Sequence, residues 1–243
     1  VADQTVSVTT TDDDVAGFTI AETSGSTGVD ESGSTDIFTV VLNAEPSSNV
    51  VLDITSSDTG EATVTSSLTF TAANWDTAQT VTVTGVDDDI VDGSVTSTIT
   101  VAINDGSSDD NFDAVADQTV SVTTTDDDVA GFTIAETEGS TGVDESGSTD
   151  LFTVVLNAQP TTDVVLSISS ADTGEATVTS SLTFTSANWD TAKTVTVTGG
   201  DDNIIDGTQT STITVSIIDG ISDNAFDAVA DQTVSVTTTD DDV

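Results

Sequence analysis

Carboxylates are the residues of this chain that could do chemistry, and they are both numerous and clustered. The 243 residues include 44 Asp and Glu against one cationic side chain, Lys193, with no His and no Cys. Three adjacent aspartates follow the same TVSVTTT run at three places: Asp12, Asp13 and Asp14; Asp126, Asp127 and Asp128; and Asp240, Asp241 and Asp242. Oxygen ligands without nitrogen or sulfur ligands suit a hard cation rather than zinc.

Further acidic residues fall in polar loops between runs of alternating residues. The first set is Asp30, Glu31, Asp58, Glu61, Asp87, Asp88, Asp89 and Asp92, and the second set is Asp144, Glu145, Asp172, Glu175, Asp201, Asp202 and Asp206. Crowded carboxylates repel each other by roughly 1 to 4 kcal/mol per pair, and this chain has almost no Lys or Arg to compensate them. Calcium takes several oxygen ligands and tolerates irregular loops, so we expect several Ca²⁺ ions at domain ends and at the junction between repeats.

The overall charge and the missing residue types exclude several classes of function. A net charge of -43 makes nucleic acids and anionic membrane surfaces poor partners, because both are anionic. No stretch approaches the roughly 18 consecutive apolar residues of a spanning helix, so no membrane insertion is expected. The chain is not expected to be an enzyme, since it lacks the His, Cys, Tyr and Arg that most acid–base and nucleophilic catalysis uses.

The acidic loops belong to two long repeats. The segment VADQTVSV begins at Val1, Val115 and Val229, which gives a period of 115 − 1 = 114 residues. Between residues 15–128 and 129–242 we count 21 differences in 114 positions, so 93 of 114 residues, or 82%, are identical. We expect one immunoglobulin-like repeat over 15–128 and a second over 129–243, with residues 1–14 as the last strand and linker of a preceding repeat.

Alternation of apolar and Thr or Ser residues predicts the strands that position these loops. Seven strands are expected in the first repeat, marked by Phe18 and Ile20; Phe38, Val40 and Leu42; Val50, Leu52 and Ile54; Leu68 and Phe70; Val81 and Val83; Ile99, Val101 and Ile103; and Val120 and Val122. Helix signals are absent. The predicted fold is all-β, with two tandem antiparallel immunoglobulin-like seven-stranded β-sandwiches arranged end to end.

If successive strands alternate in direction, the acidic loops around 30–31, 58–61, 87–92 and 126–128 all lie at one end of the sandwich. Asn203 replaces Asp89 in the second copy, which suggests that Asp89 is peripheral to the site. The loop before the last strand falls at the opposite end. Its acidic residues in the second repeat could complete a junction ion site or be ordinary turn residues; they are Asp219, Asp223, Asp227 and Asp231.

The stretches TVSVTTTDDDVAGFTI, VDESGSTDIFTV and LTFTAANWDTAQTVTVTGVDDDIVDG resemble a Calx-beta domain. In particular they resemble the immunoglobulin-like extender repeats of giant calcium-dependent bacterial surface adhesins of the RTX type, over both repeats. The resemblance implies calcium ligands at Glu31, Asp87, Asp88, the carbonyl of Ile90, Asp92 and Asp126 to Asp128, and at Glu145, Asp201, Asp202, Ile204, Asp206 and Asp240 to Asp242. The family's acidic position between strands three and four has no clean counterpart here, which leaves Asp58 or Glu61 as the ligand in the first repeat and Asp172 or Glu175 in the second. A later acidic position of the family falls near Val95, whose side chain cannot bind calcium.

The expected function is that of calcium-rigidified spacer repeats in a large bacterial cell-surface adhesin, which project a distal adhesive domain for attachment or biofilm formation. The expected partners are calcium and neighbouring repeats of the same chain, the expected location is extracellular, and the chain is expected to be monomeric. Two alternatives stay open: a ligand-binding adhesin module, which would need a distinctive exposed patch or pocket, and a Calx-beta-type calcium sensor, which would need a conformational output.

Overall fold

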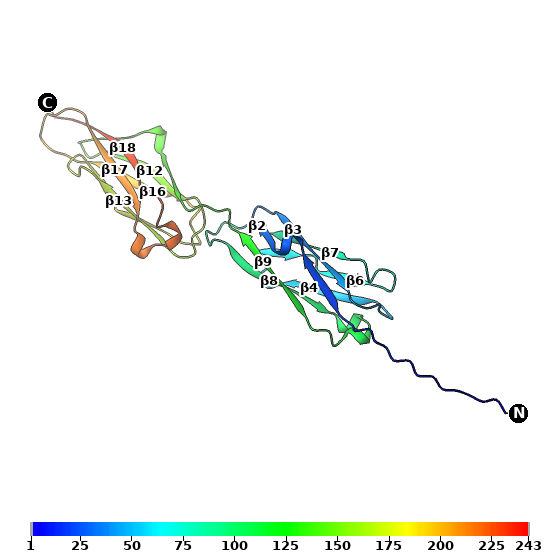
Figure 1. The fold of residues 1–243 in the computed structure, drawn as a ribbon. Helices are drawn as coiled ribbons and strands as arrows, with labels where there is room; N and C mark the ends of the chain where they lie inside the picture. The colour runs from blue at the N-terminus through cyan, green and yellow to red at the C-terminus, as the bar shows by residue number, and fades with distance from the viewer. Residues whose placement is uncertain (1, 243) are drawn as a thin grey trace. The chain divides into compact units, whose positions relative to one another are not determined.

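A computed structural model describes residues 2–242, and Val1 and Val243, which the predicted domain boundaries include, lie outside the described residues. Two compact units emerge from its contacts. The first contains the chain up to Asp88 together with Ser94–Asp127, and the second contains Asp89–Gly93 together with the chain from Asp128. The first unit therefore holds most of the predicted first repeat together with the residues before it, whereas Asp89–Gly93 and Asp128 of that repeat fall in the second unit. The repeat boundaries themselves stay a prediction. Figure 1 shows strands throughout the two units.

Each unit holds a four-stranded and a five-stranded sheet. In the first unit the four-stranded sheet has the order β1-β3-β7-β5, with bounds Phe18–Glu22, Thr35–Leu42, Gln79–Gly85 and Ala62–Val64. The five-stranded sheet has the order β2-β9-β8-β4-β6, with bounds Thr27–Asp30, Gln118–Thr125, Val95–Ile103, Val50–Ser56 and Ser67–Phe70.

The second unit repeats this topology. Its four-stranded sheet has the order β10-β12-β16-β14, with bounds Phe132–Glu136, Thr149–Leu156, Lys193–Gly199 and Ala176–Val178. Its five-stranded sheet has the order β11-β18-β17-β13-β15, with bounds Thr141–Asp144, Gln232–Thr239, Gln209–Ile217, Val164–Ser170 and Ser181–Phe184. Short 3-10 turns account for the helical residues described, at η1 Thr23–Gly25, η2 Asp105–Ser107, η3 Asp110–Phe112, η4 Thr137–Gly139, η5 Asp219–Ile221 and η6 Asn224–Phe226.

The predicted all-β sandwich fold is confirmed, with two additions in each unit. Short strands that the alternation did not reveal occur at β2 and β5 in the first unit and at β11 and β14 in the second. The expected antiparallel pairing has one exception per unit, because β2 pairs with β9, and β11 with β18, in parallel. The cause is a turn at η1, where Ser24 and Gly25 have φ of 60° and 81° and redirect the chain from one sheet to the other.

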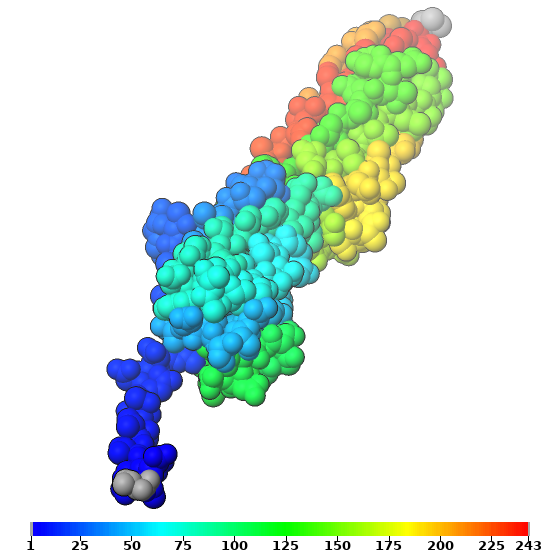
Figure 2. Space-filling view, turned by 90° about the vertical axis from the view of Figure 1, so that its right-hand side faces the viewer, coloured from blue at the N-terminus to red at the C-terminus, as the bar shows by residue number. Residues whose placement is uncertain are grey.

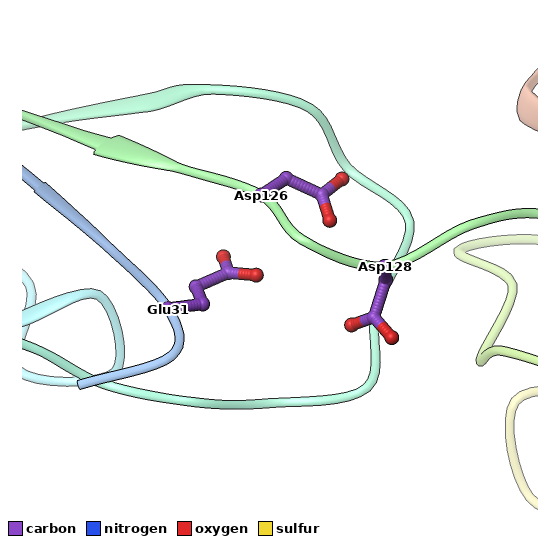
Figure 3. A group of neighbouring side chains, drawn as sticks. All are labelled: Glu31, Asp126 and Asp128. Carbon is purple, nitrogen blue, oxygen red and sulfur yellow. The ribbon is translucent and has the colours of Figure 1, made fainter. Parts of the chain in front are cut away.

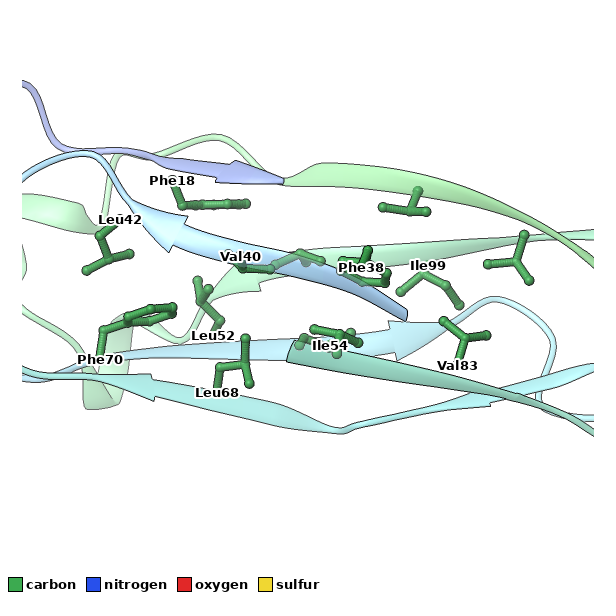
Figure 4. Packing of buried hydrophobic residues seen from close by; sticks show 14 of the residues in the cluster. Phe18, Phe38, Val40, Leu42, Leu52, Ile54, Leu68, Phe70, Val83 and Ile99 are labelled. Carbon is green, nitrogen blue, oxygen red and sulfur yellow. The ribbon is translucent and has the colours of Figure 1, made fainter. Parts of the chain in front are cut away.

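The alternating apolar residues fill the space between the two sheets of each unit. Figure 4 shows this core in the first unit, where Phe38, Val40 and Phe70 are fully buried between β3 and β6. The intervening Thr and Ser residues face outward, so each strand has one buried side and one solvated side. A sandwich of this kind fixes the ends of its strands, and the loops at those ends inherit fixed positions.

Residues 2–17 form no strand in this structure, and the assignment of residues 1–14 to the last strand of a preceding repeat stays a prediction. Residues 2–15 are exposed, and Figure 2 shows this N-terminal stretch, in dark blue, as a thin extended chain. The same TVSVTTT letters form β9 and β18, where a neighbouring strand supplies hydrogen-bond partners. Strand formation here depends on a partner strand rather than on the local residues.

An aspartate in the long loop before the last strand of each unit accepts hydrogen bonds from a distant turn and so holds the loop in place. The Asp223 carboxylate accepts hydrogen bonds from the Thr161 hydroxyl at 2.7 Å and the Thr162 N–H at 2.8 Å. Its counterpart Asp109 accepts from the N–H and the hydroxyl of Ser47 at 2.6 and 2.7 Å. Asp223 is therefore a buried turn residue, which supports the turn alternative of the sequence analysis at this position.

Within the described residues, no helix is long and apolar enough to cross a membrane.

Candidate metal centre

Three carboxylates of the second unit converge at the end of its five-stranded sheet. Glu145 follows β11, and Asp240 and Asp242 follow β18, its parallel neighbour, so the pairing of the two strands brings their ends together. A backbone hydrogen bond of 3.1 Å from the Glu145 N–H to the Thr239 carbonyl continues this pairing beyond the strands. One carboxylate oxygen from each of the three residues lies within 4.8 Å of the others.

Asp240 is the most firmly held of the three. Its Oδ2 accepts a hydrogen bond of 2.7 Å from the Gly207 N–H, and its Oδ1 accepts one of 2.8 Å from the Asp242 N–H. These two bonds favour the charged form and lower the pKa of Asp240. Gly207 ends the loop after β16, where its φ of 73° suits glycine. The bond therefore ties the 201–206 loop to the end of β18.

Burial and mutual repulsion raise the pKa of several carboxylates at this end of the second unit. Burial, followed by the charge of Asp240, raises the pKa of Glu145, which is only 1% exposed. Burial and the charges of Asp206, Asp172, Asp202 and Asp240 raise the pKa of Glu175 in the same way. Burial, Asp240, Asp241, Asp202 and Asp201 raise the pKa of Asp242. Residues of four separate loops thus share one electrostatic environment.

Buried oxygens without hydrogen-bond partners lie at the centre of this environment. Among the described residues, such atoms include Glu145 Oε2, Glu175 Oε2, Asp242 Oδ2 and, in the first repeat, Glu31 Oε2. A buried carboxylate oxygen that accepts no hydrogen bond is energetically costly. A cation would satisfy several such oxygens at once, so the residues present fit a metal site.

The first repeat brings its equivalent residues together. Figure 3 shows Glu31, Asp126 and Asp128 with their carboxylates directed toward a common space, and one oxygen from each lies within 4.8 Å of the others. A second group of the same kind joins Glu31 to Glu61 and Asp92. Burial and the charges of Asp126, Asp88 and Glu61 raise the pKa of Glu31 from 4.5 to about 7, against the opposing effect of a backbone hydrogen bond from Asp127.

The geometry distinguishes the two acidic residues that the sequence left as alternatives. Glu61 is 6% exposed and belongs to a carboxylate group, whereas Asp58 is exposed and its Oδ1 accepts a 3.0 Å hydrogen bond from the Gly60 N–H. Asp172 closes the same turn on Gly174 at 3.0 Å. The arrangement thus favours Glu61 and Glu175 over Asp58 and Asp172.

Several of the predicted ligands lie outside the carboxylate groups of the described chain. Asp127 and Asp241 contribute backbone hydrogen bonds to Glu31 and Glu145 rather than close carboxylate oxygens. The other such residues are Asp12, Asp13, Asp14, Asp58, Asp87, Asp88, Asp172, Glu175, Asp201, Asp202, Asp206, Ile90 and Ile204. Of these, Asp88, Asp201, Asp202 and Asp206 still act on the site through their charge. The side chain of Ile204 is 60% exposed.

Two glycines support the site and were not identified in the sequence. A Cβ on Gly199, the last residue of β16, would lie 2.0 Å from the Asp144 carbonyl oxygen, and one on Gly85 would lie equally close to the Asp30 carbonyl. Only glycine therefore lets the loop that carries Glu145 or Glu31 approach this strand end. The signal was present in the letters TVTVTG, which end in glycine in both repeats.

No protein-family model and no curated protein matches the chain. Among solved structures, the chain is similar to CBD12 from CALX1.2, with 14% identity, a TM-score of 0.37 and coverage of 90% of this chain and 99% of that chain. The calcium binding domain CBD12 of CALX1.1 matches with 16% identity, a TM-score of 0.34 and coverage of 82% and 80%. Domains 4 and 5 of the S-layer protein SbsC match with 16% identity, a TM-score of 0.36 and coverage of 93% and 99%. These likenesses are distant, so the fold rests on the strand pairing and the site on its own geometry.

Proposed function

We propose that this chain is a pair of extender modules whose ends are stabilised by calcium. One observation carries the proposal: Glu145, Asp240 and Asp242 bring carboxylate oxygens within 4.8 Å of one another, with Glu145 1% exposed and its Oε2 without a hydrogen-bond partner in the described structure. An acidic loop that served only solubility would leave its carboxylates in water.

In the second repeat, Glu145, Asp240 and Asp242 would hold the cation, with Glu175 and the loop at Asp202 and Asp206 close enough to contribute charge. In the first repeat, Glu31, Glu61, Asp92, Asp126 and Asp128 would do the same. A bound divalent cation supplies positive charge and several coordination bonds to oxygen. Calcium is favoured over zinc, since the chain offers no His and no Cys.

The role of the ion in this proposal is mechanical. When it is bound, the ends of β9 and β18 and the acidic loops beside them are held together, and the Val-Ala-Gly link that follows Asp128 is restrained at its start. Without it, the carboxylates repel one another, the loops separate, and the free energy of unfolding falls by the lost binding linkage. Repeated along a chain, this change would convert a stiff spacer into a flexible one.

The resemblance to adhesin repeats supports the proposal that such a spacer lies on a bacterial surface, where it would hold a distal adhesive domain away from the cell. Extracellular calcium is abundant enough to load sites with Kd values of order 10⁻⁴ to 10⁻³ M, which extracellular modules use. Two near-identical copies suit a protein that gains length from repetition, with calcium and neighbouring repeats of the same chain as its partners.

The test is thermal melting and small-angle X-ray scattering of the chain in millimolar calcium, in excess EDTA, and in magnesium at equal ionic strength. We expect the protein to melt higher and to scatter as a stiff particle only in calcium. Magnesium separates specific binding from general screening of the -43 charge. Equal melting temperatures and scattering profiles in all three buffers would refute the proposal and leave the aspartates as solvated turns.

A further inference from the structure

Two large apolar side chains lie exposed in an acidic loop of the second unit. Ile204 is 60% exposed and Ile205 is 69% exposed, within the sequence DDNIIDG. Burying two isoleucine side chains removes a large apolar area from water, and polar residues would serve an exposed loop equally well. A neighbouring surface that covers them would explain their presence.

The same positions of the first repeat, Ile90 and Val91, indicate what that surface is. They belong to Asp89–Gly93, the segment that joins the second compact unit. Ile90 forms a parallel bridge with Gln159, and both flanking backbone bonds form: the Val91 N–H donates to the Gln159 carbonyl at 3.2 Å, and the Gln159 N–H donates to the Asp89 carbonyl at 2.6 Å.

Side-chain packing adds to this backbone pairing. Val91 is partly buried against the core of the second unit, and it shares the lining of one pocket with Ala130 and Val229. Ile90 is also partly buried. The residues equivalent to the exposed pair are thus partly buried when the turn that contains Gln159 lies beside them.

Both sides of this contact occur in each copy of the module. The glycine after the apolar pair has nearly the same φ in both repeats, 75° at Gly93 and 73° at Gly207. The receiving turn reads Asn-Ala-Gln-Pro at 157–160 and Asn-Ala-Glu-Pro at 43–46. Because the contact uses the backbone of Gln159, the Glu45 of the other copy can present the same N–H and carbonyl.

We propose that Ile204 and Ile205 form a docking surface for a further copy of this module, which seats its Asn-Ala-Gln/Glu-Pro turn on them by a parallel backbone bridge. The inference rests on the tandem-array part of the proposed function and adds a contact made by backbone pairing and isoleucine side chains rather than by carboxylates. Backbone pairing sets the register, and the two isoleucines supply apolar burial at a junction otherwise dominated by carboxylates.

Cysteine cross-linking tests this directly, because the chain contains no Cys. The reference is the present chain with Ile90→Cys and Gln159→Cys, which should form a disulfide under mild oxidation. The test chain carries a third copy of residues 129–242 after Asp242, with Ile204→Cys and a Cys at the added copy's counterpart of Gln159. A control chain pairs Ile204→Cys with a Cys at the added copy's counterpart of Ser186, an exposed residue.

We expect the test pair to cross-link within about threefold of the reference rate, and at least tenfold faster than the control pair. A test pair no faster than the control would overturn the inference, and so would a reference pair that fails to link. In a second measurement, Ile205→Ser should lower the Tm of the three-copy chain and leave that of the present chain unchanged. An equal loss of Tm in both chains would show that the side chain serves its own module, against the inference.

The two proposals can fail independently. Cross-linking that persists while calcium leaves melting and scattering unchanged would refute the calcium spacer and uphold the docking surface. A calcium-dependent rise in Tm without cross-linking of the test pair would refute the docking surface and uphold the calcium spacer.

Discussion

Replacing Glu31 with Gln should change the stability of the protein in opposite directions with and without calcium. Glu31 is 1% exposed, and its carboxylate lies within 4.8 Å of oxygens of both Asp126 and Asp128. Two unit charges 4.8 Å apart repel by about 0.9 kcal/mol in water and about 3.5 kcal/mol at an effective dielectric constant near 20. Glutamine keeps the shape of the side chain and removes its charge.

Partial protonation limits this repulsion. Because the pKa of Glu31 is raised to about 7, the calcium-free protein carries the Glu31 charge about half of the time at pH 7. Two pairs at half occupancy give about 1 to 3 kcal/mol. We therefore expect Glu31→Gln to raise the Tm of the first unit in EDTA by roughly 4 to 12 °C. In calcium, loss of a charged ligand should weaken binding by at least about tenfold and lower the Tm.

The assay is differential scanning calorimetry in EDTA and across a calcium titration, with Glu45→Gln as the matched control. That control removes the same charge from an exposed position where the second repeat already carries Gln159. It should leave both the Tm in EDTA and the calcium affinity unchanged. If Glu31→Gln left the Tm in EDTA unchanged, or lowered it, the reasoning about uncompensated buried charge would be wrong.

The pH dependence of the same residue follows from the direction of its shift. Folding raises the pKa of Glu31 above its ordinary 4.5, so between about 4.5 and 7 the folded protein holds a proton that the unfolded chain has released. Stability in EDTA should therefore fall as pH rises through this window, and Glu31→Gln should flatten that part of the curve. Calcium affinity should rise over the same window, since binding displaces the proton.

Three further predictions concern the scaffold. Asp223→Ala should destabilise the second unit by at least about 2 kcal/mol in urea unfolding, because it removes charge-assisted hydrogen bonds from Thr161 and Thr162. Since folding lowers the pKa of Asp223, the stability that this carboxylate contributes should be lost as the pH drops below about 4. A difference in stability between the wild type and the variant that did not change with pH in this range would contradict the prediction. Gly199→Ala places a Cβ 2.0 Å from the Asp144 carbonyl oxygen and should lower stability by about 1 to 3 kcal/mol together with calcium affinity, whereas equal Tm and affinity would show that the loop yields freely. Glu138→Gly relieves a φ of 58° and should raise the Tm of the second unit by a few degrees at most, with no gain counting against strain at this turn.

The strands could be predicted because their signal is local. Val40 and Phe38 alternate with Thr and Val on β3, and a period of two is sufficient to identify a half-buried strand. The two short strands β2 and β5 were missed because four and three residues are too few to show a period. The N-terminal TVSVTTT run has the pattern of β9, but among residues 2–242 no strand pairs with it, so the pattern alone does not produce a strand.

Sequence alone therefore determined the composition of the site: oxygen ligands, excess negative charge and loops at one end of each repeat. Tertiary structure decided which carboxylates meet. The parallel pairing of β11 with β18 places Glu145 beside Asp240, and the turn on Gly60 occupies Asp58 while Glu61 is buried. Coulomb repulsion and coordination both depend on distances of a few ångströms between residues far apart in the chain. Those distances follow from the packing of two sheets, which no local pattern of residues contains.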